Sequence, residues 1–213
     1  MFGAKVLLAS LGLMLMIMSA GRVESRVFGN TASDDKSREA VYAWLKDLTK
    51  GKSGLGEPKI ALVDGSVRDM FPHDRFYSIR FMRYPRAVKP PAPLKLENLI
   101  RVRSNGLVEQ IGTLDALKNL VKTQLGEIRG DEQARAAVMA CLRLAEEFFQ
   151  DGSYVFSIPV QSVSVVRRDG HFAIKGKAVV TKGGHGEITV SLTTGDGGEV
   201  SIEGKVRPNV RLR

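Results

Sequence analysis

Residues 131–150 decide the fold, and they read DEQARAAVMACLRLAEEFFQ. The apolar side chains recur every three or four positions, a spacing that places them on one face of an α-helix. They are Ala134, Ala137, Val138, Cys141, Leu142, Ala145, Phe148 and Phe149. The charged side chains fall mostly on the opposite face: Glu132, Arg135, Arg143, Glu146 and Glu147. The pattern predicts an amphipathic helix. We expect the consecutive carboxylates Glu146 and Glu147 to be solvated.

The chain after Ser153 supplies a surface for this helix, because its apolar period changes to two, as in half-buried strands. Turn-forming residues at 169–170, 182–186 and 195–198 divide it into four strands of an antiparallel meander. The residues expected to face the helix are Phe172, Ile174, Gly176, Ala178, Val180, Ile188, Val190, Leu192, Val200, Ile202, Gly204 and Val206. We therefore predict an α+β fold, with the helix packed on a curved four-stranded antiparallel sheet.

The first of these strands contains an irregular step. Its inward series is Tyr154, Phe156, Ile158 and Val160, and the series resumes at Val163 and Val165. A step of three inside a period of two predicts a β-bulge at Gln161-Ser162 that bends the strand.

The order of a helix followed by a four-stranded meander resembles the cystatin-like α+β architecture of cystatins, NTF2-like proteins and PepSY-type modules. The resemblance covers about residues 131–206. Cystatins carry a Gln-x-Val-x-Gly hairpin, and the nearest match, Gln161-Ser-Val-Ser-Val165, lacks the glycine and falls in an expected strand. For NTF2-like members the resemblance implies a pocket between helix and sheet. Its lining here would be Phe148, Phe149, Phe156, Phe172, Ile174, Val190 and Ile202. A filled core is the simpler interpretation of that set.

The N-terminal half has a similar order of elements. A helix is predicted from Ser33, its capping residue, to Lys50-Gly51, with Val41 and Leu45 on its apolar stripe. Short strands are predicted at 59–63, 75–83, 97–103 and 107–111. The last two flank Ser104-Asn105-Gly106, which predicts a type I′ hairpin turn. The proline-rich residues 89–94 predict a stiff, extended crossover.

The predicted helices of the two halves share a similar sequence pattern. Arg38-x-Ala40-Val41-x-Ala43-x-Leu45-Lys46 matches Arg135-x-Ala137-Val138-x-Ala140-x-Leu142-Arg143 at a constant offset. Tandem α+β modules are one interpretation, and coincidence among common helix formers is the other. We divide the chain into an N-terminal module at 33–112, a connecting helix at 113–130 that opens at Thr113, and a C-terminal module at 131–213.

The N-terminus predicts export. Lys5 is followed by the uncharged run 6–18 and by Ser19-Ala20-Gly21, the three parts of a cleavable signal peptide at about residues 1–20. The run is shorter than the roughly 20 residues of a membrane-spanning helix. We expect a secreted or periplasmic product. Cys141 is the single cysteine, and its place on the apolar face predicts a core residue.

The sequence has a formal net charge of +9, and basic residues concentrate in its middle. A basic cluster favours polyanions through long-range attraction. The candidate polyanion-binding residues are Arg75, Arg80, Arg83, Arg86, Lys89, Lys95, Arg101 and Arg103. The alternative interpretation is a solubilising face. Because export separates the protein from most nucleic acid, a polyanionic surface polymer or an acidic protein is the expected partner.

No motif for catalysis is present. The chain contains no nucleophile elbow, phosphate loop or dinucleotide-binding turn. His73, His171 and His185 lack partners at metal-ligand spacing, and we expect all three at the surface. We predict no catalytic residue, metal or cofactor, and a non-enzymatic binding module. The alternatives are an NTF2-like ligand-binding or hydrolase domain using His171 or His185, and a regulator of an extracellular protease acting through a sheet edge.

Overall fold

The computed structural model describes residues 31–50, 58–81, 99–150 and 154–208. The expected signal peptide and the proline-rich residues 89–94 lie outside these ranges. So do four of the candidate binding residues, Arg83, Arg86, Lys89 and Lys95. No helix in the described ranges is both long and apolar enough to span a bilayer.

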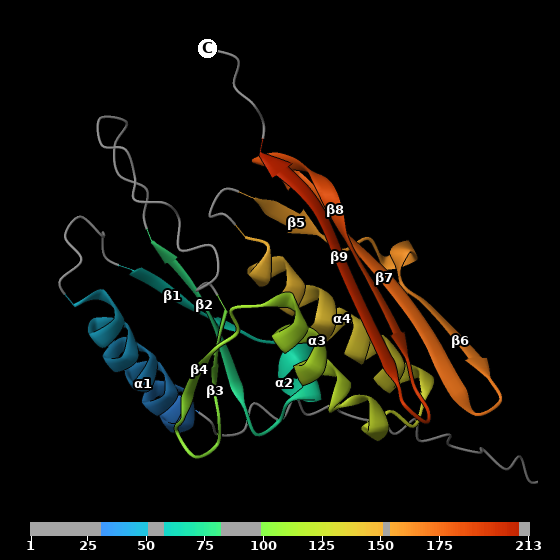
Figure 1. Ribbon diagram of the computed structural model, residues 1–213, viewed down its shortest axis with the longest axis horizontal. Helices are drawn as coiled ribbons and strands as arrows, with labels where there is room; N and C mark the ends of the chain where they lie inside the picture. The colour runs from blue at the N-terminus through green and yellow to red at the C-terminus, as the bar shows by residue number, and fades with distance from the viewer. Residues whose placement is uncertain (1–30, 51–57, 82–98, 151–153, 209–213) are drawn as a thin grey trace, which may run out of the picture. The chain divides into compact units, whose positions relative to one another are not determined.

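The N-terminal half contains one antiparallel sheet, here called the first sheet (Figure 1). Its elements are α1 (Thr31–Thr49), β1 (Pro58–Val63), α2 (Ser66–Met70), β2 (Arg75–Phe81), β3 (Leu99–Val102) and β4 (Val108–Gln110). The strands lie in chain order, β1-β2-β3-β4. The four predicted strands are confirmed within the described residues, whereas the short helix α2 was not predicted. Since α1 begins at Thr31, Ser33 lies inside the helix and not at its cap.

The C-terminal half contains the second sheet. Its elements are α3 (Leu114–Lys122), the 3₁₀ turn η1 (Leu125–Glu127), α4 (Asp131–Phe148), β5 (Val155–Ser157), the 3₁₀ turn η2 (Val160–Ser162), β6 (Ser164–Arg168), β7 (His171–Lys182), β8 (Gly184–Thr193) and β9 (Glu199–Pro208). The strand order is β5-β7-β8-β9, and β6 also pairs with β7. The predicted α+β class and antiparallel meander are confirmed.

Helix α4 packs on the second sheet through glycines in the strands. A methyl group at Gly176 of β7 would lie 2.8 Å from both Leu142 and Val138, and one at Gly204 of β9 would lie 2.4 Å from the ring of Phe149. Glycine at these inward positions lets the helix approach the strands closely. The inward face of the meander was therefore predicted correctly, including both glycines.

Helix α4 also has a second buried face, which was not predicted. Ala140 and Leu144 are fully buried, and one continuous core joins α4 to Phe76 and Leu99 of the first sheet. The expectation that Glu146 and Glu147 are solvated is wrong. Glu146 is only 6% exposed, and the Glu147 side chain is 19% exposed. The reason is that α4 lies between two sheets, so that a polar face predicted from spacing alone is covered.

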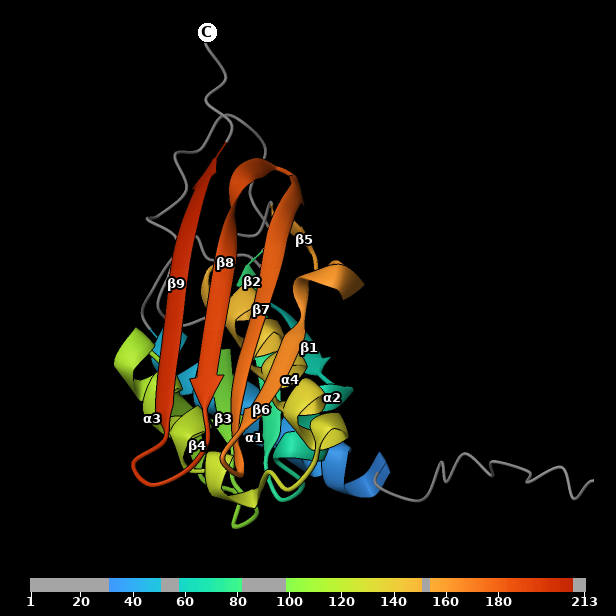
Figure 2. The ribbon, with the colours of Figure 1, turned by 90° about the vertical axis from the view of Figure 1, so that its right-hand side faces the viewer.

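Helix α1 covers the other face of the first sheet. Val41 and Leu45 are buried in a separate core with Tyr77, Ile79, Ile100 and Val102. The described chain from α1 onward is thus layered as helix, sheet, helix and sheet, and Figure 2 looks onto the second sheet with α4 behind it. The face of the second sheet that is turned away from α4 is its outer face.

Three local predictions need correction. The break in the first strand of the meander is a 3₁₀ turn, η2, instead of a bulge, and Val160 is 87% exposed instead of inward. Ser162 Oγ fixes this turn by donating to Lys177 O at 2.8 Å. The β3–β4 hairpin is not type I′, because Gly106 has a positive φ (83°) and Asn105 does not. The connecting helix expected at 113–130 ends at Lys122, although its cap is confirmed by a hydrogen bond from Ala116 N to Thr113 Oγ1.

Candidate binding surface

The described members of the predicted basic cluster lie in or directly after the first sheet, and each is paired with an acid. Arg75 Nε donates to Asp34 Oδ1 at 2.7 Å, and the Arg75 side chain is 9% exposed. Burial by itself would raise the pKa of the Asp34 carboxyl, but hydrogen bonds from Arg75 and Arg68 outweigh it and hold the pKa below its ordinary value. Arg75 therefore fastens β2 to α1.

Arg80 points to the opposite side of the first sheet. Its Nη2 donates to both oxygens of Glu147 in α4, at 2.8 and 2.9 Å. Ser78, which is 1% exposed, donates to the same carboxylate. Arg75 and Arg80 thus lie on different faces of β2 and do not contribute to one surface.

Arg101 and Arg103 form a third set of ion pairs. Arg101 Nη2 lies 2.6 Å from Asp74 Oδ2, and Arg103 Nη2 lies 2.7 Å from Glu109 Oε1. Glu109 also accepts from Arg101 at 3.4 Å. All four described members of the predicted cluster are thus already neutralised by acids of this chain. Their density in the sequence does not translate into an open basic patch.

Unpaired cations gather instead on the outer face of the second sheet. In β6 to β9 the inward positions are apolar except at Arg167, which lies over the Phe172 ring, and the alternate positions face outward. The outward cations are Arg168, Lys175, Lys177, Lys205 and Arg207, and the outward acids are Glu187, Glu199 and Glu203. Lys177 pairs with Glu187 at 3.2 Å. Among the described residues, the other four cations have no acid partner, and all four are exposed.

Hydroxyl groups separate these charges. Thr189, Ser191 and Thr193 alternate along β8 with the buried Val190 and Leu192. Lys175, Ser191 and Ser201 occupy one row across β7, β8 and β9, because Ser191 is the register partner of both neighbours. The outer face therefore combines cations with groups that both donate and accept hydrogen bonds.

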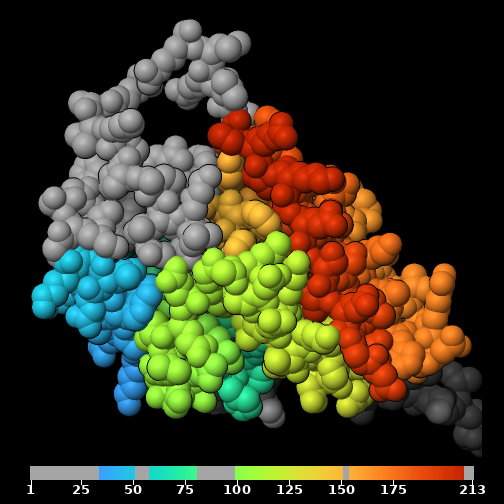
Figure 3. Space-filling model, in the orientation of Figure 1, coloured from blue at the N-terminus to red at the C-terminus, as the bar shows by residue number. Residues whose placement is uncertain are grey.

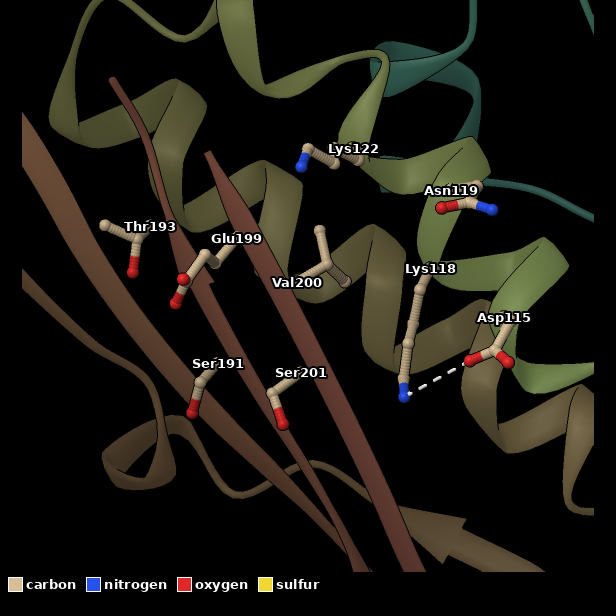
Figure 4. A pocket seen from close by; sticks show the side chains of 9 residues that line it. All are labelled: Asp115, Lys118, Asn119, Lys122, Ser191, Thr193, Glu199, Val200 and Ser201. Atoms are coloured by element: carbon tan, nitrogen blue, oxygen red, sulfur yellow. Dashed lines mark ion pairs between the residues drawn. The ribbon is translucent and has the colours of Figure 1, made fainter. Parts of the chain in front are cut away.

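The row of Lys175, Ser191 and Ser201 leads into a polar hollow beside α3. The hollow has a volume of about 570 Å³ (Figure 4). It is lined by Asp115, Lys118, Asn119, Lys122, Ser191, Thr193, Glu199, Val200 and Ser201. The α3 side chains lie on one side of β9, and Ser191 and Thr193 lie on the other. Figure 3 shows the surfaces of α3 and β9 adjoining on one face of the molecule.

The hollow holds both signs of charge. Lys118 Nζ lies 3.6 Å from Asp115 Oδ1, a long ion pair in which Asp115 is exposed and Lys118 is partly buried. Lys122, Asn119 and Glu199 have no side-chain partner among the described residues. Val200 is the single apolar member of the lining. This composition suits a hydrophilic ligand that carries hydroxyl groups and a charge.

The residues that would line an NTF2-like pocket lie in or against the core where α4 meets the second sheet. Phe172, Ile174, Val190 and Ile202 of the expected lining are buried in the core, and Phe148, Phe149 and Phe156 pack against it. His73, His171 and His185 are exposed, as predicted. No group of three metal-ligating side chains occurs within the described ranges. Cys141 is fully buried, as predicted, and burial raises the pKa of its thiol.

No protein-family model matches the sequence, and neither a curated protein nor a solved structure matches it significantly. The outward cations were visible in the sequence, since Lys175, Lys177, Lys205 and Arg207 alternate with the apolar positions used to predict the sheet. The hollow was not, because no pattern in α3 or β9 shows that they are neighbours.

Proposed function

We propose that the protein is an exported, non-enzymatic binding module that holds an anionic polymer against the outer face of its second sheet. The observation that carries the proposal is the contrast in pairing. Arg168, Lys175, Lys205 and Arg207 are exposed and have no acid partner among the described residues, whereas Arg75, Arg80, Arg101 and Arg103 are all paired.

Pairing matters because an arginine whose charge is neutralised by a carboxylate of the chain attracts a second anion only weakly. Binding a polymer at Arg75 or Arg80 would break an ion pair that is partly or largely buried, and leaving the carboxylate unpaired is strongly unfavourable. An exposed lysine gives up only its hydration and counterions, and several such cations on one face attract a polyanion over a distance of about 10 Å at moderate salt.

The architecture supports the choice of face. In our proposal the chain is a tandem of two helix-plus-meander modules. Val41 and Leu45 in α1 and their counterparts Val138 and Leu142 in α4 are all buried, and in each half an antiparallel sheet follows the helix, with four strands in the first half and five in the second. The first sheet has α1 on one side and α4 on the other. The outer face of the second sheet has no such helix across it among the described elements, and its polar side chains suit a partner in water.

The test is retention of the protein on heparin as salt is raised. A variant with Arg168→Gln, Lys175→Gln, Lys205→Gln and Arg207→Gln removes four positive charges from the outer face. The matched control removes the same number and type of charge elsewhere, with Lys36→Gln, Arg38→Gln, Lys46→Gln and Arg135→Gln, all at exposed positions.

We expect the wild type and the control to elute at similar salt, and the outer-face variant to elute much earlier. The slope of log affinity against log salt falls in proportion to the ion contacts that are lost. If both variants lose retention equally, net charge alone explains binding and the outer face has no special role. If the wild type flows through at low salt, the proposal is wrong.

A further inference from the structure

The outer face is not uniformly basic, and its acids restrict the kind of polymer that fits. Glu187 lies between two cations: its carboxylate is 3.2 Å from Lys177 Nζ, and Lys205 is its register partner on β9. Glu203 is the register partner of Thr189, and Glu199 that of Thr193. A polymer with a charge on every short link, such as polyphosphate, would bring phosphates against these carboxylates, and like charges in contact are unfavourable.

A chain whose charges are spaced by hydroxyl groups avoids this repulsion. Its hydroxyls can donate to Glu187, Glu199 and Glu203, while its carboxylates meet Lys175, Lys205 and Arg207. The Ser and Thr hydroxyls of β8 and β9 then supply both donors and acceptors along the same path. Alternation of charge with hydroxyl groups is the chemistry of an acidic polysaccharide.

The outward positions also lack the feature that single-stranded nucleic acid requires. Non-specific recognition of single strands uses aromatic side chains on which the bases stack. Among the described residues, the outward positions of β6 to β9 hold no Phe, Tyr or Trp, and neither does the lining of the hollow. A nucleic acid would therefore be held only by electrostatic attraction between its phosphates and the outer-face cations, without base stacking.

We propose, on the basis of the proposed function above, that the polymer is a uronate-bearing polysaccharide and that the hollow beside α3 binds one of its sugar units. Lys122, whose ammonium group points toward the strands in Figure 4, is placed to donate to the sugar carboxylate. The sugar hydroxyls face Ser191, Ser201 and Glu199 (Figure 4). The two serine hydroxyls can both donate and accept hydrogen bonds, and the Glu199 carboxylate accepts them. The volume of about 570 Å³ lies within the usual range of about 300–1,000 Å³ for small-molecule sites.

The row from Lys175 through Ser191 to Ser201 connects this unit to the rest of the polymer. Because the row crosses β7, β8 and β9, a chain seated in the hollow continues across the strands toward Lys175. The hollow thus provides selectivity for the sugar, and the outer-face cations provide the long-range attraction.

The experiment compares binding of the whole protein to four probes at one salt concentration: polygalacturonate, polyphosphate, single-stranded DNA and dextran. Two variants accompany the wild type. Lys122→Gln with Ser201→Ala alters the hollow, and Lys46→Gln with Ser157→Ala is the control with the same changes at exposed positions elsewhere. Unaltered thermal unfolding of both variants verifies that the fold is intact.

We expect polygalacturonate to bind more tightly than polyphosphate or DNA, and dextran not to bind. The hollow variant should lose about tenfold in affinity for polygalacturonate, which corresponds to one charged hydrogen bond. Its affinity for polyphosphate should change little, and the control variant should match the wild type. Trigalacturonate should compete with polygalacturonate for the wild type and much less well for the hollow variant.

The two proposals fail in different ways. If polyphosphate or DNA binds as tightly as polygalacturonate, or if the hollow variant keeps full affinity, the polysaccharide inference is overturned while binding of anionic polymers stands. If no anionic probe binds at low salt, both are overturned.

Discussion

Ser78 in β2 and Glu147 in α4 are joined by a hydrogen bond of 2.5 Å from the serine Oγ to the carboxylate Oε2, across 69 positions of sequence. Arg80 donates to both oxygens of the same carboxylate. The carboxylate was predicted to be solvated. It instead joins the first sheet to the helix of the second half through these polar contacts.

Replacing Glu147 by alanine should therefore destabilise the whole described unit. The substitution leaves Ser78 buried without its acceptor and Arg80 without its ion-pair partner. A buried polar group without a partner costs about 1–3 kcal/mol. We expect the free energy of unfolding at pH 7, measured by urea titration, to fall by about 2 kcal/mol or more. Glu132→Ala, on the exposed part of the same helix, is the control. Equal losses in the two variants would show that the link contributes nothing.

Glu146 provides a prediction about pH. Its side chain is buried, Oε2 receives a hydrogen bond from Arg143, and Oε1 has no hydrogen-bond partner among the described residues. Burial raises the pKa of Glu146, although Arg143 opposes the shift. A pKa that is higher in the folded state stabilises the fold at pH values below the unfolded pKa. That contribution is lost as pH rises through the folded pKa.

The free energy of unfolding of Glu146→Gln should accordingly rise relative to that of the wild type as pH increases. We expect the stability of the variant relative to the wild type to be lowest at pH 4 and to rise toward pH 8, in unfolding titrations at each pH. Arg143, which is about half exposed, remains hydrated when its partner is lost. A difference between the two proteins that is constant over this range would contradict the assignment.

Close packing at Gly176 gives a third prediction. Gly176→Ala places a methyl group 2.8 Å from the side chains of Val138 and Leu142, both fully buried, so that these side chains or the helix itself must shift. Overpacking of this kind costs about 1–3 kcal/mol. Gly126→Ala is the control, because nothing lies within 4 Å of its added methyl group. We expect a lower melting temperature for the first variant and little change for the second. Equal melting temperatures would mean that the interface relaxes without cost.

The contrast between these residues shows what the sequence could and could not predict. The inward face of the second sheet, including Gly176 and Gly204, follows from a period of two. So does the alternation that places Lys175 and Lys205 outward. Both are local properties of a strand, and a local pattern is sufficient to assign them.

Pairing between distant segments is not a local property. Nothing in the spacing of α4 reveals that Ala140 and Leu144 face a second sheet, or that Glu147 meets Arg80. The basic cluster was misleading for the same reason, since the acids that neutralise Arg75 and Arg80 lie in α1 and α4. A charge count along the sequence cannot distinguish a cation that faces solvent from one that a distant carboxylate has already paired.

Asp34 and Arg75 give the last prediction, which separates an ion pair within the fold from a binding site. Arg75 is 8% exposed and also donates to Pro72 O and Asp74 O, at 3.1 and 2.9 Å. Asp34→Ala should lower the free energy of unfolding at pH 7 by about 2 kcal/mol, because it leaves a largely buried guanidinium without its carboxylate. Asp35→Ala, an exposed neighbour in the same helix, should have little effect.

The lowered pKa of Asp34 means that its stabilising contribution is present above the unfolded pKa, about 3.9, and is lost as pH falls through the folded pKa. We therefore expect the difference in free energy of unfolding between wild type and Asp34→Ala to be constant from pH 7 to 5 and to become smaller below pH 4. Asp34→Ala and the control Asp35→Ala should elute from heparin at the same salt concentration. Stronger retention of Asp34→Ala than of Asp35→Ala would mean that Arg75 or Arg68, once freed from Asp34, can reach a polymer, and this side of the first sheet would again be a candidate surface.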